Sequence, residues 1–338
     1  LTLLGNDLSN IQTGAFSNLP KLERLYLNIN NLTKIHPDSF SNLRKLRTLH
    51  LGSNQISNID SDMFSNIPTM RKLDFTYNQV TCIQLGTFSN LPQLYKLDIA
   101  HNQITNISPG AFSSLPQLQR LDLRFNHITN ISPGAFSYLH QLQRLDLSSN
   151  HITEIQPDTF SNLPRLERLV LRCNQMTTIQ PGSFQNLPKH DILSLRDNPW
   201  QCDCRMVAFR KWMTMSPLFK NQIICEEPSK FRGQNLKDIE LGNLICEKPK
   251  IVDFQRGRAM LGRKALHLIC KASGIPTPDI SVTLPSGQNA TVESYGRVTV
   301  NKNGSIIVRD LTENDSGSYV CIAANHVASS VATLFVEI

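Results

Sequence analysis

Cysteine and histidine are the side chains of this sequence best suited to chemistry, because thiolates and imidazoles act as nucleophiles, bases and metal ligands. Cys82 and Cys173 lie in a region that repeats every 24 residues, four repeats apart. At strand spacing they would be about 19 Å apart, whereas a disulfide needs Cα atoms within about 7 Å. No histidine and acid flank either cysteine at matching spacing. We therefore predict two free thiols without a catalytic role.

Two histidines, His127 and His151, are also one period apart and could begin a metal site. No third ligand is evident, so we predict a solvated histidine pair. The sequence contains no Ser/His/Asp arrangement and no phosphate-binding loop. We expect a protein that is not an enzyme, with no catalytic residue, no cofactor and no metal.

Four further cysteines follow the repeats: Cys202, Cys204, Cys225 and Cys246. They could bind zinc or form two disulfides, and sequence alone allows three pairings. The CxC spacing and an extracellular setting both argue against zinc.

Six N-x-S/T sequons accompany these cysteines and favour that extracellular, oxidising setting. Two of the sequons are one period apart, so glycans at both would close that flank to a protein partner. The predicted glycosylation sites are Asn31, Asn106, Asn130, Asn289, Asn303 and Asn314.

Charged residues recur at three positions with the same 24-residue spacing. The first series is basic, the second is acidic, and the third carries separate arginines. One interpretation is that the basic and acidic series pair with each other laterally and diagonally. We favour it for the stretch 72–144, because exposed ion pairs need no ligand. The third series has fewer acidic partners, so the C-terminal half of this face should be net basic.

Exposed aromatic residues and arginines are typical of binding hot spots. Three aromatic residues accompany the charged series. The predicted ligand-binding residues are Tyr26, Lys72, Tyr77, Lys96, Arg120, Arg124, Phe125, Arg144, Arg168, Arg172 and Arg196.

These positions recur because the chain is built on the pattern LxxLxLxxNxI, as in LQRLDLSSNHIT at 142–153. The asparagine and a separate phenylalanine each return every 24 residues along residues 1–198. This pattern resembles the leucine-rich repeat. The resemblance implies an α/β solenoid in which each repeat gives one short strand, with its leucines pointing inward. Stacked strands would form a curved parallel sheet on the concave face, where the charged series lie.

Two structural roles follow from the repeat. The asparagine amide should satisfy backbone groups of the buried turn, and the phenylalanine should fill the outer side. Segments such as PGAFSSLPQL are too short for full helices and carry proline and glycine as turn formers.

The stretch NPWQCDC, with the two later cysteines, resembles the cysteine-rich C-terminal cap of extracellular leucine-rich repeat proteins. We expect this cap over residues 199–247. The family implies the disulfides Cys202–Cys225 and Cys204–Cys246. Trp200 and Trp212 should pack against the last repeat.

Short β-rich runs such as ALHLICKAS, DISVTL and SYVCIAAN follow from residue 248 and indicate an all-β sandwich. Cys270 and Cys321 suit its inter-sheet disulfide, and Tyr319 occupies the tyrosine-corner position. The segment 248–338 resembles an I-set immunoglobulin domain. The family places a core tryptophan where this sequence has Val282, so we expect lower stability than in its relatives.

Four basic residues near the start of this domain are Arg256, Arg258, Arg263 and Lys264. They could bind a sulfated glycan, but four charges make a small patch, and we favour a solvated edge.

The net charge of +7 is spread along the chain, which excludes a dedicated nucleic-acid binder. There is no transmembrane run and no signal peptide. The first residues already lie inside a repeat, and a solenoid needs capped ends. We expect a fragment that lacks its N-terminal cap, with any membrane anchor outside these residues.

The order of solenoid, cysteine-rich cap and immunoglobulin domain resembles the leucine-rich repeat and immunoglobulin cell-surface proteins of the LINGO, AMIGO and LRIG types, some of them from invertebrate chordates. The resemblance implies a non-enzymatic recognition protein, a receptor or adhesion molecule outside the cell, that binds an extracellular or cell-surface protein through the concave face. One alternative is an innate immune protein that binds microbial polymers such as lipopolysaccharide. Another is the non-catalytic part of a peroxidasin-type enzyme.

Overall fold

The computed structural model describes all residues except 185, 188–191, 215–218, 220–221 and 258–264. The chain forms two compact units. The first comprises Leu1–Trp200, Ala208–Cys225 and Gly233–Ile239, and the second comprises Gln201–Val207, Glu226–Arg232 and Glu240–Ile338. The expected cap, 199–247, contributes residues to both units, and the three domain boundaries stay predictions.

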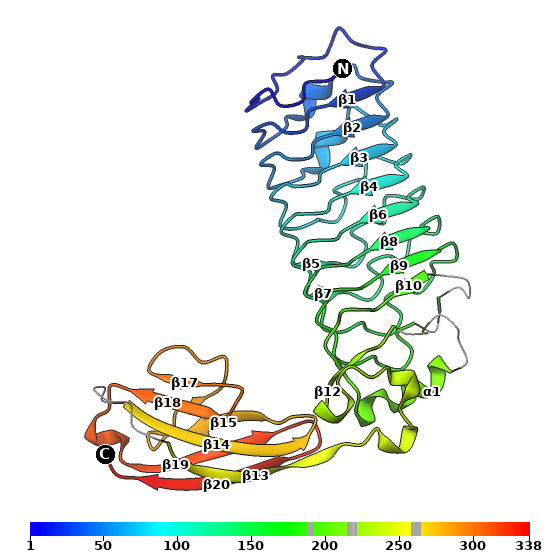
Figure 1. The fold of residues 1–338 in the computed structure, drawn as a ribbon. Helices are drawn as coiled ribbons and strands as arrows, with labels where there is room; N and C mark the ends of the chain where they lie inside the picture. Colours follow the sequence, from blue (N-terminus) through cyan, green and yellow to red (C-terminus); the bar gives the residue numbers. More distant parts are fainter. Residues whose placement is uncertain (185, 188–191, 215–218, 220–221, 258–264) are drawn as a thin grey trace. The chain divides into compact units, whose positions relative to one another are not determined.

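The first unit is built on a parallel sheet whose eight strands follow one another in chain order (Figure 1). Each strand has only three residues. Leucines lie opposite leucines across the sheet, as Leu25 does to Leu49 and Leu49 to Leu73, and all three are buried. The strands are β1 Arg24–Tyr26, β2 Thr48–His50, β3 Lys72–Asp74, β4 Lys96–Asp98, β6 Arg120–Asp122, β8 Arg144–Asp146, β9 Arg168–Val170 and β10 Ile192–Ser194. This confirms the predicted solenoid.

Short elements return the chain between strands. They include the 3-10 helices η1 Pro37–Phe40 and η2 Ser61–Phe64, and the paired two-residue strands β5 Asn106–Ile107 and β7 Asn130–Ile131. Elsewhere in the described repeats the outer side is made of turns. The phenylalanines stack behind the sheet; Phe88 and Phe112 have ring centroids 6.2 Å apart and nearly parallel planes.

A ladder of buried asparagines holds neighbouring repeats together. The side-chain nitrogen of Asn54 donates to the Leu51 carbonyl (2.9 Å) and to the Leu27 carbonyl one repeat earlier (3.1 Å). Its oxygen accepts from the Leu32 amide at 3.0 Å. Because each amide satisfies backbone groups of two repeats, the ladder meets the hydrogen-bonding demand of the buried turns.

Aromatic residues cover the last repeat within the first unit. Trp200 is buried, and its indole nitrogen donates to the Leu195 carbonyl at 3.2 Å. Helix α1 Val207–Met213 adds Phe209 and Trp212, whose rings lie 5.2 and 4.9 Å from that of Phe219. The expected packing of Trp200 against the last repeat is confirmed. Trp212 packs on Phe209 and Phe219, and its contact with the last repeat stays a prediction.

The second unit contains two antiparallel four-stranded sheets. One has the order β13–β14–β18–β17 and the other β16–β15–β19–β20. Their strands are β13 Glu247–Arg256, β14 Ala265–Ile275, β15 Asp279–Thr283, β16 Asn289–Ala290, β17 Val298–Val300, β18 Ser305–Arg309, β19 Gly317–Ala324 and β20 Ser329–Val336. The fold agrees with the immunoglobulin-like sandwich that the sequence predicts.

Smaller elements complete the described chain. They are the paired strands β11 Trp200–Gln201 and β12 Cys225–Glu227, and the 3-10 helices η3 Cys204–Met206, η5 Ser229–Phe231, η6 Leu236–Asp238, η7 Leu241–Asn243 and η8 Glu313–Asp315. Within the described residues, no helix combines the length and apolar character needed to cross a membrane.

The sandwich core carries the expected immunoglobulin marks. The Tyr319 hydroxyl donates to the Asp315 carbonyl at 2.9 Å, which is the tyrosine corner. Val282 is fully buried and lies opposite Cys321 across the sheet, so this smaller residue stands in the core where the family has tryptophan. The lower stability expected from it stays a prediction.

The six cysteines from residue 202 onward are all in disulfides. Two pairs agree with expectation: Cys204–Cys246, with Cα atoms 5.3 Å apart, and Cys270–Cys321, with Cα atoms 6.5 Å apart. Cys202 and Cys225 are also disulfide-bonded, which agrees with the third expected pair. The alternative of a four-cysteine zinc site is wrong, because sulfurs in disulfides are not thiolate ligands.

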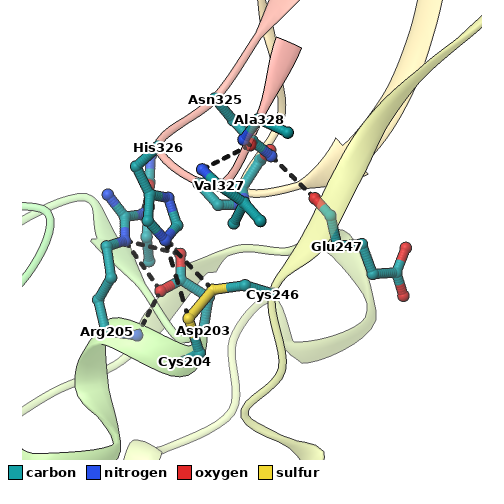
Figure 2. The surroundings of a disulfide bond; sticks show 11 residues. Asp203, Cys204, Arg205, Cys246, Glu247, Asn325, His326, Val327 and Ala328 are labelled. Carbon is teal, nitrogen blue, oxygen red and sulfur yellow. Dashed lines mark hydrogen bonds and ion pairs between the residues drawn. A yellow bond between two sulfur atoms is a disulfide. The ribbon is translucent and has the colours of Figure 1, made fainter. Parts of the chain in front are cut away.

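The turn between β19 and β20 contacts the Cys204–Cys246 disulfide within the second unit (Figure 2). His326 Nε2 lies 3.5 Å from the Cys246 sulfur and 3.8 Å from the Cys204 sulfur. Asn325 in the same turn donates to the Glu247 carbonyl at 2.9 Å. These contacts tie the cysteine-rich segment to the sandwich.

Candidate functional site

The predicted ligand-binding residues lie on or beside the outward face of the eight-stranded sheet, which we call the concave face. Side chains alternate along each strand, so the residues flanking each buried leucine point outward. Most predicted residues are exposed, whereas Tyr26 and Lys96 are half-buried. The structure thus gathers the residues on one face; their role in binding remains a prediction.

The prediction that the basic and acidic series pair with each other is wrong. Among the described residues, no first-series cation forms an ion pair with a second-series acid. Within the described part of the concave face, the acids form two ion pairs: Arg124 Nε with Asp122 Oδ2 at 3.1 Å, and His50 Nδ1 with Asp74 Oδ2 at 2.9 Å. Neither involves the basic series of the first position. Arg124 belongs to the third series, which is predicted to have fewer acidic partners, yet among the described arginines of this face it is the one with an ion pair.

Each acid of the second series accepts a backbone hydrogen bond at the end of its own strand. Asp146 accepts from the Ser148 amide at 3.0 Å and from the Ser148 hydroxyl at 2.6 Å. Asp122 accepts from the Arg124 amide in the same way, at 3.2 Å. Aspartate commonly bonds the backbone two residues ahead in turns. The first-position cations Arg144 and Arg168 have no ion pair among the described residues.

The strand register also places carboxylates opposite one another, as Asp98 opposite Asp122 and Asp122 opposite Asp146. Burial, together with the charges of Asp98 and Asp146, raises the pKa of Asp122 to about 6 against the opposing hydrogen bond and charge of Arg124. Burial also raises the pKa of Asp98. At Asp74, burial acts in the same direction, but hydrogen bonds from His50 and Thr76 outweigh it and lower the pKa. The centre of the acidic series is therefore electrostatically strained at neutral pH.

A hollow of about 260 Å³ lies over the strands from β4 to β9. Its lining includes the basic residues Lys96, Arg120, Arg144 and Arg168 and the acids of the second series. A shallow, charged surface of this kind suits a macromolecular partner better than a small ligand, because small-molecule sites are mostly enclosed and apolar.

A second feature borders this hollow: a stack of three aromatic rings from successive repeats. The rings of Tyr77 and His101 lie 4.0 Å apart, and those of His101 and Phe125 lie 4.3 Å apart, with planes within 12° of parallel. Burial lowers the pKa of His101, and the nearby charge of Arg124 acts in the same direction. The uncharged form of the imidazole is thereby favoured.

His101 was not among the predicted binding residues, although the sequence held the signal. It occupies the same position of the repeat as Tyr77 and Phe125. At this position, just before the ladder asparagine, the backbone has positive φ: 54° at Tyr77, 56° at His101 and 54° at Phe125.

Tyr26 belongs to a separate aromatic pair. Its ring lies 4.8 Å from that of His50, with planes 8° apart, and His50 in turn bonds Asp74. Tyr26 is half-buried, whereas Tyr77 is 56% exposed.

The other cysteines and histidines singled out in the sequence lie in separate places among the described residues. Cys82 and Cys173 are free and exposed, as predicted. His127 Nδ1 lies 3.3 Å from His151 Nε2. Among the described residues, one group brings three metal-ligating side chains together, Cys204, Cys246 and His326, but its two cysteines are disulfide-bonded.

All six sequon asparagines are exposed. Asn106 lies directly opposite Asn130 in the β5–β7 pair, as the repeat predicts; glycosylation at these sites stays a prediction. Of the four basic residues near the start of the sandwich, Arg256 is exposed. Arg258, Arg263 and Lys264 lie outside the described residues, so the choice between a glycan contact and a solvated edge stays open.

Family models match both parts of the chain. The leucine rich repeat model matches residues 1–56, 44–104, 92–152 and 141–199, and the immunoglobulin domain model matches residues 248–325.

Curated relatives match about two fifths of the chain. The human leucine-rich repeat and immunoglobulin-like domain-containing nogo receptor-interacting protein 2 is 32% identical over 142 residues, covering 40% of this chain and 23% of that protein. The leucine-rich repeat and fibronectin type-III domain-containing protein 2 of Mus musculus is 30% identical over 141 residues, covering 42% of this chain and 17% of that protein. The chain spans less than a quarter of the length of these relatives.

Solved structures match a larger part. Human 5T4, a trophoblast glycoprotein described as Wnt-activated inhibitory factor 1, has a TM-score of 0.61 and 25% identity, covering 72% of this chain and 93% of that chain. A chain from the octameric complex of Latrophilin 3, Unc5D and FLRT2 has a TM-score of 0.57 and 29% identity, covering 72% of this chain and 81% of that one.

Proposed function

The chain belongs to the leucine-rich repeat family, and from this premise we propose that it binds an extracellular protein partner through its concave face. Its repeats and immunoglobulin domain, together with relatives and structural neighbours of receptor or adhesion type, support an extracellular recognition module. The binding face and the specific role are our proposal.

The observation that carries the proposal is that basic side chains on the concave face have no ion pair among the described residues. Arg144 and Arg168 are exposed and have no ion pair in the described part of the chain; the nearby Asp146 carboxylate accepts from the Ser148 amide and hydroxyl. Exposed arginines and aromatic residues on one face offer a partner both charge and apolar contact. The leucines and asparagines are buried and maintain the fold. The outward positions can vary without disturbing it, so they can determine binding specificity.

The comparisons agree with a protein partner. One structural neighbour comes from a complex of three kinds of protein, one of which is described by its leucine-rich repeats. The human relative is named as a nogo receptor-interacting protein. By analogy, we propose a cell-surface receptor or adhesion role without catalysis, with the chain as an ectodomain or a secreted protein and the immunoglobulin domain as a spacer or second contact.

Binding of an anionic microbial polymer is the second candidate, because the same unpaired cations would attract a polyanion. The two candidates differ in salt dependence. Exposed charges are screened within about 8 Å at physiological ionic strength, so a polymer held by charge alone should dissociate as salt rises. A protein partner that also buries aromatic residues should persist.

A binding screen tests the proposal. The multimerised fragment would be applied to cell-surface ectodomains, sulfated glycans and lipopolysaccharide at low and physiological salt. Any partner would then be tested against the Arg144→Glu/Arg168→Glu variant. The matched control is Lys45→Glu/Lys302→Glu, which makes the same change in net charge at exposed lysines outside the concave face.

We expect a salt-tolerant ectodomain partner whose affinity falls at least about tenfold in the arginine variant but not in the control. Equal affinities of the wild type and the arginine variant for that ectodomain would remove the concave face from the account.

A further inference from the structure

The aromatic stack ends in an open ring face at Phe125. His101 covers one face of the Phe125 ring at a centroid distance of 4.3 Å, yet 48% of Phe125 is exposed. The exposed area must therefore come from the ring edge and from the opposite face. One strand further along, the equivalent position is Ser149, which carries no ring. The stack thus stops where a fourth ring would fit, at a spacing of roughly 5 Å per strand.

Arginines flank this open position. In the neighbouring series, Arg124, Ser148 and Arg172 occupy successive strands, and Ser148 is only 4% exposed. Because Ser148 is small and buried, no long side chain stands between the two exposed arginines in this series. Arg124 is held by Asp122 at 3.1 Å, whereas Arg172 has no ion pair among the residues that the structure describes. Arg172 is therefore available to an incoming anion.

The other end of the stack lacks this charge. Beyond Tyr77 the equivalent position is also a serine, Ser53, but the neighbouring series there reads Gly52 and Thr76. A partner group that is only aromatic could use either end. One that is aromatic and anionic should select the Phe125 end.

We propose that the position beside Phe125, where Ser149 carries no ring and Arg172 is free, binds an acidic aromatic segment of the protein partner. An aromatic side chain of that segment stacks on Phe125 as a fourth ring, and an adjacent carboxylate pairs with Arg172. This proposal rests on the proposed function and specifies the chemistry of the partner. Ring stacking supplies directional apolar contact, and arginine binds carboxylates through paired, planar donors. Together they distinguish such a segment from a polyanion without rings.

Fluorescence anisotropy with labelled synthetic peptides tests the proposal. The probe is Gly-Ser-Asp-Glu-Tyr-Asp-Glu-Ser-Gly. A second peptide replaces its tyrosine with leucine, and a third replaces its acids with the corresponding amides. Heparin serves as a polyanion without aromatic rings. We expect the probe to bind the full fragment at least about fivefold more tightly than either altered peptide, which is the ratio expected when one stacking or one ionic contact is lost.

Three variants probe the site itself. Phe125→Leu keeps apolar bulk but removes the ring, Arg172→Glu reverses the free charge, and Ser149→Phe supplies the fourth ring from the chain. Each should weaken probe binding at least about fivefold. The controls are Tyr138→Leu, at an exposed tyrosine outside the stack, and Lys302→Glu, which matches the charge change of Arg172→Glu. Both controls should bind as the wild type does.

The proposal is overturned if the probe does not bind, if the leucine peptide binds equally well, or if Phe125→Leu and Ser149→Phe leave the affinity unchanged. Tight heparin binding that is unaffected by Phe125→Leu, without peptide binding, would also overturn it in favour of a polyanion site. These results are separate from the screen for a partner. An ectodomain whose binding is lost in Arg144→Glu/Arg168→Glu would still support the concave face even if the peptide result were negative.

Discussion

Replacing Asp122 with asparagine should stabilise the repeat unit at pH 7. Burial and the neighbouring aspartates raise the pKa of this carboxyl to about 6 from an ordinary 3.8. A difference of about 2 units corresponds to a penalty of at most about 3 kcal/mol on the charged form. The side chain keeps 21% of its surface exposed and faces Arg124. Solvent screening and the lost ion pair reduce the expected gain to roughly 1–2 kcal/mol.

The pH dependence gives the sign of the effect. Because the pKa is higher in the folded than in the unfolded state, the folded protein holds more protons between about pH 4 and pH 6. The contribution of Asp122 to stability is therefore greatest below pH 4, falls as the pH rises through 6, and stays low above it. The Asp122→Asn variant lacks this dependence, and its side-chain oxygen can still accept from the Arg124 amide, 3.2 Å away in the wild type.

Thermal denaturation at pH 5 and pH 7 measures this difference. For a unit of this size, 1–2 kcal/mol corresponds to a shift in Tm of roughly 3–6 °C. We expect Asp122→Asn to melt higher than the wild type at pH 7, with the gap narrowing at pH 5. Asp62→Asn, at an exposed aspartate in η2, provides the control. A variant that melts lower than the wild type at pH 7 would refute the account of a strained acidic series.

Three further substitutions test the packing. Gly304→Ala should destabilise the sandwich by more than about 2 kcal/mol, because its φ of +83° is unfavourable to alanine and the new Cβ would lie 2.0 Å from a backbone oxygen of β14. Gly287→Ala has the same φ but no atom within 4 Å, so a smaller loss in a thermal melt is expected there. Tyr319→Phe removes the bond to the Asp315 carbonyl and should cost about 1 kcal/mol in urea unfolding; an unchanged midpoint would argue against the tyrosine corner as a stabilising contact. Asn126→Ala leaves buried backbone groups of two repeats without partners and should cost roughly 2–4 kcal/mol by the same measurement, whereas a loss below 1 kcal/mol would mean that water replaces the amide.

The sequence predicts the solenoid well because the 24-residue period is carried by residues that are stable in only one kind of environment. A buried asparagine that returns every 24 residues, such as Asn54 or Asn78, is tolerated only where its amide meets backbone groups. The sandwich is predicted for a similar reason. The disulfide and the tyrosine corner each require particular residues at fixed positions in the sandwich. Cys270, Cys321 and Tyr319 meet this requirement, so the domain was predicted even though Val282 stands where the family has tryptophan.

The candidate site was predicted less completely, because a repeat pattern shows which positions are equivalent but not which neighbour each side chain bonds. The charged series predicted which side chains share the outward face of the sheet, but not the partners of their charges. The sequence suggested that Asp146 pairs with a basic neighbour, whereas its carboxylate turns to the amide two residues ahead. The stack of Tyr77, His101 and Phe125 depends on the positive φ of three residues. That backbone conformation is common at glycine but not at aromatic residues.

The contact between His326 and the Cys204–Cys246 disulfide joins residues that are 80 and 122 positions apart in the chain. No local pattern encodes it, because it depends on how a turn of the sandwich meets the cysteine-rich segment.

The most direct test of the central claim is to shield the concave face with a glycan. Asp146→Asn creates an N-x-S sequon with Leu147 and Ser148 in the middle of the sheet face. The double variant that adds Ser148→Ala carries the same asparagine without the sequon. Binding of the ectodomain partner would be measured for the glycosylated single variant and for the double variant. The account predicts that the glycosylated protein loses binding while the double variant retains most of it. Full binding by the glycosylated protein would contradict recognition through the concave face.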